Sequence, residues 1–314
     1  MPCLLLSCIV MMLNTVGLSI SDAFTLVQNR VASLAAAAAR QHPVRIVAVS
    51  KTKPAADILE LYNSHGHRDF GENYVQELSD KARNLPPDIR WRFIGHLQSN
   101  KCKSLVSIPN LQCIETIDST SLASQLQKEM AKLPASDRRL DVMIQVNTSL
   151  EDSKSGVDYN KFEEIVSLAR FIQTECGHLN LTGLMTVGAP THAPTPSLAD
   201  INSQLLAAGT VQDVGGCVGV IAKAAHADVS RYPLLIQWYR QHSQGSSNSS
   251  SSINNRDFQC LRQVRDGLAA ALQVAPSSLE LSMGMSGDFE AAIVNSSDSI
   301  RIGSLIFQPR ETKS

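Results

Sequence analysis

The run Arg45-Ile46-Val47-Ala48-Val49-Ser50-Lys51-Thr52-Lys53-Pro54 joins a short apolar segment to the beginning of a helical pattern. Such a continuous apolar segment is typical of a strand that is buried on both faces of a parallel sheet. Pro54 suits the first turn of a helix, because its missing N–H would have no partner there. Residues 45–54 therefore predict a strand followed directly by a helix.

The same strand-then-helix pattern recurs along the chain. Further β-type runs are found at residues 69–72, 91–95, 113–117, 142–146, 181–187, 279–283 and 300–304. An amphipathic helix over residues 22–41 precedes the first strand. The alternative, an open doubly wound sheet, often begins with a Gly-rich dinucleotide turn, and none follows the first strand. Eight strands alternating with helices therefore predict an α/β fold of the (β/α)8 TIM-barrel type.

The length of the chain exceeds what one barrel needs. It has 314 residues, whereas a typical barrel has about 250, which leaves roughly sixty to place. Residues 189–256 break the strand–helix rhythm and end in a serine-rich tract. We predict one domain, residues 22–314, with an insertion at 189–256 after the sixth strand. An insertion without a functional role is favoured over a lid on the active-site face.

The apolar N-terminal segment, residues 1–21, carries no charged side chain and is predicted to lie outside the fold. It lacks the basic region of a secretory signal, the arginines of a transit peptide and the length of a membrane span. We therefore expect a cytoplasmic protein with no membrane partner, with the mitochondrion as the alternative location.

Charge and cysteine usage exclude other classes of protein. The chain has 28 basic and 29 acidic side chains, so a phosphate-neutralising surface and a nucleic-acid partner are not expected. The seven cysteines are dispersed, which predicts reduced thiols and no metal site. The pair His65-Gly66-His67 is interpreted as a solvated turn and not as a metal site.

Lys51 is the first candidate for chemistry, because functional side chains in a TIM barrel gather at the carboxyl ends of the strands. A lysine at the end of a buried strand is costly to desolvate, and burial favours its neutral, nucleophilic form. This property suits Schiff-base formation with an aldehyde cofactor. The alternative, which spacing alone leaves open, is a lysine that extends to the solvent at the rim.

The last two strand ends predict a phosphate site. Met285-Ser286 and Gly303-Ser304 supply hydroxyls and backbone N–H groups after strands seven and eight, where barrels frequently bind phosphate. A helix beginning near Gly287 or Asp288 would direct its positive end to this point. Arg301, two residues before Gly303, should share its inward face. The alternatives are ordinary turn residues and an exposed arginine.

Taken together, residues 47–54, 70–77, 93–98, 281–286 and 301–304 closely resemble the pyridoxal 5′-phosphate homeostasis protein family. The resemblance covers residues 22–188 and resumes at 257–307. It implies a fold-type III barrel that holds pyridoxal 5′-phosphate as an internal aldimine. By this resemblance Lys51 is the Schiff-base lysine and Arg301 faces the pyridine nitrogen. The remaining cofactor residues that it implies are the phosphate-side Met285, Ser286, Gly303 and Ser304, and the pocket residues Asn73 and His96.

The chain departs from that family in three places: the insertion 189–256, Gln308-Pro309 in place of the usual glycine, and the apolar N-terminus. The first and second leave the cofactor lysine, Lys51, untouched. The insertion and the Gln308-Pro309 substitution put loop closure and oligomer contacts in question.

Two functions from different classes fit these residues. In the first, the protein stores pyridoxal phosphate and delivers it to apoenzymes without turnover. In the second, it is an amino-acid racemase, which needs a second acid/base on the opposite face of the cofactor. Alanine racemases supply that group as a tyrosine through a C-terminal β domain, for which the sequence after Phe307 leaves no room. The sequence therefore favours a non-catalytic carrier, expected as a monomer or weak dimer. A barrel enzyme for a phosphorylated metabolite would explain the phosphate loops but not the lysine.

Overall fold

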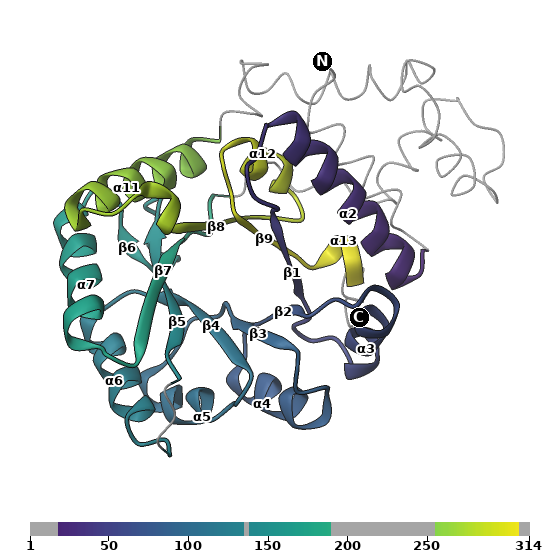
Figure 1. Ribbon diagram of the computed structural model, residues 1–314, viewed down its shortest axis with the longest axis horizontal. Helices are drawn as coiled ribbons and strands as arrows, with labels where there is room; N and C mark the ends of the chain where they lie inside the picture. The colour runs from purple at the N-terminus through teal and green to yellow at the C-terminus, as the bar shows by residue number, and fades with distance from the viewer. Residues whose placement is uncertain (1–17, 135–137, 190–254, 308–314) are drawn as a thin grey trace.

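The computed structural model describes residues 18–134, 138–189 and 255–307, and their strands form a closed parallel barrel (Figure 1). The barrel strands, in their order around the ring, are β1 (Arg45–Val49), β2 (Asp69–Glu72), β3 (Arg90–Phe93), β4 (Leu111–Ile117), β5 (Leu140–Asn147), β7 (Leu179–Met185), β8 (Glu280–Met285) and β9 (Ser299–Ile302). Pairing of β9 with β1 and of β4 with β5 closes the ring. The predicted (β/α)8 TIM barrel is confirmed.

Helices surround the barrel on its outside (Figure 1). They are α2 (Ile20–Ala37), α3 (Ala55–His65), α4 (Val75–Asn84), α5 (Cys102–Val106), α6 (Thr120–Met130), α7 (Phe162–Glu175), α11 (Arg256–Leu272), α12 (Phe289–Val294) and α13 (Ser304–Phe307), with 3-10 turns at Ser99–Lys101 and Pro276–Ser278. Each follows a strand, except α2, which precedes β1. This order makes every barrel pairing parallel.

The sequence missed the short elements β6 (Val157–Asp158), α5 and α13, and the predicted strand bounds differ from the observed ones by at most two residues at either end. Strand β6 pairs with the end of β5, and two residues are too few for a periodicity signal. Helix α5 has five residues, and its short apolar run has no helical repeat to detect. Ser304, predicted to lie in the last strand, is the first residue of α13.

The core has two layers on either side of the strands. Outward-facing side chains such as Phe70 and Trp91 pack with the helices in one continuous cluster, to which α2 contributes Phe24. A small separate cluster of Cys113, Met143 and Met185 fills part of the barrel interior. Because the large aromatic side chains lie in the outer layer, the interior keeps room for polar groups.

The predicted domain boundaries shift by a few residues. Helix α2 begins at Ile20, with the Ser19 hydroxyl accepting the amide of Asp22. Ser21 N–H also donates to Glu60 at 3.1 Å, so the last residues of the predicted outer segment 1–21 belong to the fold. At the end of the insertion, Asn255 caps α11, which starts at Arg256.

The two flanks of the insertion lie side by side. The amide of Ala189 donates to Asp257 Oδ2 at 2.6 Å, so the chain leaves the barrel and returns to it at one point. The predicted insertion 189–256 itself falls almost wholly on residues 190–254, which lie outside the described residues. An insertion with adjacent ends can be accommodated without separating β7 from α11.

The pair His65 and His67 is not the solvated turn that the sequence predicts. The His67 ring lies 4.7 Å from that of Phe24, and its Nε2 contacts the Asp69 carbonyl at 2.8 Å. Burial lowers the pKa of His67, and this outweighs the opposing effect of Asp69. His65 contacts the Ser21 hydroxyl. Both histidines therefore contact residues of α2 and hold this helix against the neighbouring elements.

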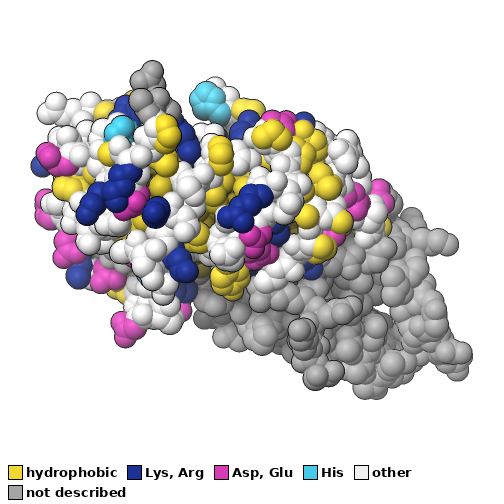
Figure 2. Space-filling view, turned by 90° about the horizontal axis from the view of Figure 1, so that it is seen from below, with side chains coloured by type: hydrophobic (Ala, Val, Ile, Leu, Met, Phe, Trp, Pro, Cys, Tyr) yellow, Lys and Arg dark blue, Asp and Glu magenta, His cyan; other side chains and the backbone are white. Residues whose placement is uncertain are grey.

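In the described ranges, no helix combines the length and apolar character needed to cross a membrane, and no group of three His, Cys, Asp or Glu side chains is placed to bind a metal. Basic and acidic side chains are interspersed on the face shown in Figure 2. Cys102, Cys113, Cys176 and Cys260 are free thiols.

Candidate functional site

Lys51 follows the inward-facing residues of β1 in the chain. A Cβ built on Gly71 would lie 2.9 Å from Val47 Cγ1 and 3.6 Å from Val49 Cγ2, and neither valine belongs to the outer cluster. Lys51 lies two residues beyond Val49 in the turn that follows β1, so a continuation of the strand alternation would place it on the same side as these valines. Lys51 is half-buried. The sequence prediction of a lysine at the carboxyl end of the first strand agrees with this position.

The loops after β8 and β9 meet each other and the end of β1. Gly303 N–H donates to the Ser286 hydroxyl at 3.2 Å. A Cβ on Gly303 would lie 3.4 Å from the Val49 carbonyl oxygen, two residues before Lys51. Ser286 is 8 % exposed. The structure therefore brings the two predicted phosphate loops together beside the predicted lysine.

Met285 and Ser304 differ from the sequence prediction. The Met285 amide donates to Asp288 Oδ1 at 2.6 Å, so this N–H is not one of the unobstructed donors expected for a phosphate. Burial raises the pKa of Asp288. The Met285 side chain is an exposed rim residue, and Ser304 is exposed as well. Helix α12, expected to begin near Gly287 or Asp288, begins at Phe289 and is only six residues long.

Gly284 explains why this loop folds tightly against α12. Its φ is +97°, and an added Cβ would lie 2.5 Å from the Ala292 Cβ atom. Only glycine accepts both the left-handed backbone and the close approach. The loop that presents Ser286 is thereby held on α12.

Arg301 is a buried interior residue, so the alternative of an exposed charge is wrong. Its guanidinium donates to Ser282 Oγ and to the Thr186 carbonyl, both at 2.7 Å. Burial lowers the pKa of Arg301, although Glu115 opposes this effect. A guanidinium has five N–H donors, and these two hydrogen bonds use two of them.

A polar chain crosses the barrel interior beneath Arg301. Glu115 accepts from Arg92 Nε at 2.5 Å and from Ser282 Oγ at 2.6 Å. It also lies 3.8 Å from an Arg301 nitrogen. Burial alone would raise the pKa of Glu115, but the two arginines and the Ser282 hydroxyl outweigh it and lower the pKa. Glu115 therefore stays ionised and fixes Ser282, which in turn fixes Arg301.

Asn73 lies at the end of β2 with an unsatisfied polar atom. Its Oδ1 is buried and has no hydrogen-bond partner within the described ranges. The neighbouring Gly95 lets the chains approach, since an added Cβ would lie 2.1 Å from the Asn73 carbonyl oxygen. A buried polar atom without a partner costs free energy, so its presence points to a ligand group. This agrees with the predicted role of Asn73.

His96 lies further out than a pocket residue would. It is exposed, and its Nδ1 contacts the Ser155 hydroxyl at 3.1 Å. Ser155 belongs to the segment between β5 and β6, whose main chain is bound by Gln145. His96 therefore joins this segment to the β3 end at the rim of the barrel.

Two hollows lie away from the interior face of Lys51. A shallow depression of about 810 Å³ lies between the β1–α3 loop and α4, on the outside of the barrel. A cavity of about 530 Å³ opens at the amino ends of the strands, lined by Arg45, Asp69, Arg90, Arg92, Asp141, Glu280 and neighbouring residues. The first borders the backbone of the Lys51 loop, and the second is at the opposite end of the barrel.

Sequence reasoning missed the residues that position the candidates, namely Glu115, Ser282 and Thr186. Glu115 could have been found, because a carboxylate in the apolar run Cys113–Ile117 marks an inward position. Ser282 and Thr186 carry no such signal, since buried hydroxyls are common on strands.

These residues fit pyridoxal phosphate. Its aldehyde requires an amine, its phosphate requires hydroxyl and amide donors, and its ring nitrogen requires a polar neighbour. Lys51, the Ser286–Gly303 pair and Arg301 supply these groups at one end of the barrel, and Asn73 Oδ1 adds an unsatisfied acceptor.

Comparison with known proteins defines the class. Residues 26–311 match the family model "Alanine racemase, N-terminal domain". A chain from Bifidobacterium adolescentis, described as an unknown protein, has a TM-score of 0.64 and 27% identity over 92% of this chain and 94% of its own. PipY of Synechococcus elongatus, solved with PLP bound, has a TM-score of 0.55 and 26% identity over 88% and 99%. The fold and site thus define an alanine-racemase-type barrel.

The "Pyridoxal phosphate homeostasis protein" of Pongo abelii is 36% identical over 302 residues, which cover 94% of this chain and 88% of that protein. The chain belongs to the pyridoxal phosphate homeostasis protein family. Alanine racemase from Corynebacterium glutamicum shares only the fold, with a TM-score of 0.52 and 14% identity over 92% of this chain and 62% of the racemase.

Proposed function

We propose that this protein binds pyridoxal phosphate covalently at Lys51 and takes part in its homeostasis, holding the cofactor and delivering it to apoenzymes in the cytoplasm. The observation that carries the proposal is the meeting of the Lys51 strand end with the Ser286–Gly303 pair at one end of the barrel. The family relationship and the PLP-bound PipY relative support it.

Each residue has a role that follows from its chemistry. When bound, pyridoxal phosphate would supply an aldehyde, which reacts with an amine with loss of one water, and a phosphate, which needs hydrogen-bond donors. The Lys51 nitrogen is the nucleophile. The Ser286 hydroxyl, which accepts from Gly303 N–H, would be one of the groups beside the phosphate. Asn73 Oδ1 offers an acceptor to the bound ring.

Arg301 is compatible both with holding the cofactor and with turnover. A guanidinium has only donors, so Arg301 would leave a pyridine nitrogen beside it unprotonated and the ring a weaker electron sink, in a carrier and in a racemase alike. Glu115 and Ser282 keep Arg301 in place on the barrel interior. We propose a carrier and not a racemase, and the support is the 36% identity to a pyridoxal phosphate homeostasis protein against 14% to an alanine racemase.

The test is to add pyridoxal phosphate to the purified protein, record the visible spectrum, reduce with borohydride and map the labelled peptide. We expect a yellow protein and a pyridoxyl group on Lys51. Lys51→Ala should abolish the label, whereas the matched control Lys53→Ala should retain it. A protein that stays colourless, or a label on another lysine, contradicts the proposal.

Turnover is tested separately. The loaded protein is incubated with single-enantiomer amino acids and their chirality is followed. We expect the enantiomeric purity to persist. Sustained exchange at the α-carbon would make the protein a racemase.

A further inference from the structure

The loop that carries Lys51 is bound from outside the barrel. On one side of Lys51, the Ser50 hydroxyl donates to Glu72 Oε1 at 2.6 Å. On the other side, the Thr52 amide donates to Glu77 Oε1 at 2.6 Å. Both flanking residues of the lysine are thus hydrogen-bonded to carboxylates.

One lysine joins these contacts. Lys81 Nζ donates to the Ser50 carbonyl at 2.8 Å and to Glu72 and Glu77 at 2.7 Å each. Lys81 and Glu77 lie one turn apart on α4, and Glu72 ends β2. We call Glu72, Glu77 and Lys81 the clamp.

Two of the three clamp residues are buried, and the Glu77 side chain is 23% exposed. Glu72 is fully buried and Lys81 is 8 % exposed. Burial raises the pKa of Glu72 against the opposing effect of Lys81. Removing charges from water is costly, so a buried ionic cluster is weak evidence for stability and better evidence for a required local geometry.

The required geometry is visible at Thr52. Its φ is +63°, in the left-handed region that β-branched residues avoid. Such strain persists only where the surroundings over-determine the backbone, and it gathers at functional sites. The charge-assisted hydrogen bond from the Thr52 amide to Glu77 supplies this restraint.

We propose that Glu72, Glu77 and Lys81 are positioning residues that set the backbone on both sides of Lys51 and so present its amine to pyridoxal phosphate. This inference rests on the proposed function of Lys51. The clamp acts through the Ser50 carbonyl and the Thr52 amide, from the outer side of the sheet, and does not itself contact the cofactor.

The decisive variant is Glu77→Ala. Without the carboxylate, the Thr52 amide loses its acceptor and the strained turn relaxes. We expect faster hydrogen exchange of the Thr52 amide in the protein without cofactor. We also expect pyridoxal phosphate to bind on the order of tenfold more weakly in a spectral titration, as for the loss of one charge-assisted hydrogen bond.

Three further variants separate positioning from general destabilisation. Glu77→Gln keeps an oxygen acceptor and should restore most of the binding. Thr52→Gly added to Glu77→Ala should also restore it, because glycine adopts the φ of +63° without strain. Asp80→Ala, on the exposed side of the same helix, is the matched control and should behave as the wild type.

Each outcome decides between the alternatives. If the Thr52 amide exchanges and pyridoxal phosphate binds in Glu77→Ala as in the wild type, the positioning role is contradicted. It is also contradicted if adding Thr52→Gly to Glu77→Ala does not restore binding. If Glu77→Ala does not fold, Glu77→Gln and Thr52→Gly are compared with the wild type by exchange. If wild-type Lys51 is never labelled, the proposed function fails, while the exchange experiment still tests the clamp.

Discussion

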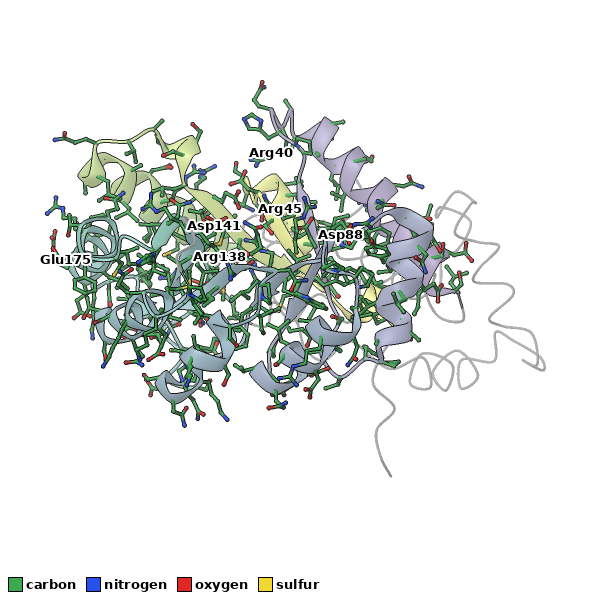
Figure 3. All side chains as sticks on the ribbon, turned by 60° about the horizontal axis from the view of Figure 1, so that its bottom comes forward. Arg40, Arg45, Asp88, Arg138, Asp141 and Glu175 are labelled. Carbon is green, nitrogen blue, oxygen red and sulfur yellow. The ribbon has the colours of Figure 1, made fainter. Side chains whose placement is uncertain are left out.

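The polar side chains at the two ends of the barrel differ in how they are paired, although Ser299 Oγ at the start of β9 is also buried without a partner in the described residues. At the amino end, Arg45 forms a bidentate pair with Glu280, with contacts of 2.7 and 3.2 Å. Asp141 accepts from the side-chain amides of Gln112 and Asn180. Arg45 and Asp141 are labelled in Figure 3. At the carboxyl end, Asn73 Oδ1 lacks a partner in the described structure, and Thr52 is strained.

The paired groups at the amino end contribute to stability, whereas Asn73 and Thr52 at the carboxyl end lie beside the proposed cofactor site. Polar groups that satisfy each other need no ligand, whereas an unsatisfied buried acceptor and a strained turn cost free energy that a bound molecule can offset. Between the two ends, hydrogen bonds join Arg92 to Glu115, Glu115 to Ser282 and Ser282 to Arg301. Substitutions at the two ends and in the middle of the barrel test this difference.

The largest effect on stability is expected in the middle of the barrel. Glu115→Ala leaves Arg92 and Arg301 buried without their carboxylate, which should lower the free energy of unfolding by about 3–5 kcal/mol. Urea unfolding measures the change. Glu115→Gln, which keeps hydrogen-bonding atoms, should lose less. A loss below about 1 kcal/mol for Glu115→Ala would contradict a structural role for this chain.

Asn73→Ala should separate binding from stability. Removing the unsatisfied Oδ1 should leave the cofactor-free protein as stable as the wild type or about 1 kcal/mol more stable, and should weaken pyridoxal phosphate binding about tenfold. Thermal unfolding and spectral titration give the two quantities. Asn110→Ala, whose amide donates to Ile89 O, is the control and should lose stability without losing binding.

A smaller effect is expected at the amino end. Because both side chains of the Arg45–Glu280 pair are 34 % exposed, a double-mutant cycle should give a coupling free energy of only about 0.5–1 kcal/mol. Cofactor binding should not change. A tenfold loss of binding in Glu280→Ala would show that this end also serves the site.

The smallest effect is expected from pH in the neutral range. The pKa of Glu115 is lowered in the folded protein, so its contribution to stability is fully present above its unfolded value of about 4.3. This contribution is lost as the pH falls below that value toward the folded pKa. The stability difference between wild type and Glu115→Gln should thus be constant from pH 6 to 8 and shrink below pH 4. A constant difference down to pH 3 would contradict the lowered pKa.

The sequence identified the cofactor residues better than it identified what holds them. Lys51, Arg301 and Gly303 stand at strand ends, and strand ends are visible as the limits of apolar runs. Met285 was misjudged as a backbone donor, because the sequence does not show that Asp288 turns back to take its amide. His67 was misjudged because its contact with Phe24 spans more than forty residues.

The amino-acid sequence by itself determined the parallel barrel, the lysine at the end of the first strand and the family, since apolar periodicity and contiguous motifs are local properties of the chain. Tertiary structure alone decided that Glu115 ties Arg301 to Arg92, and that Glu72, Glu77 and Lys81 enclose the turn at Thr52. These contacts join different strands and helices. Their strength comes from burial, which exists only once the barrel has closed.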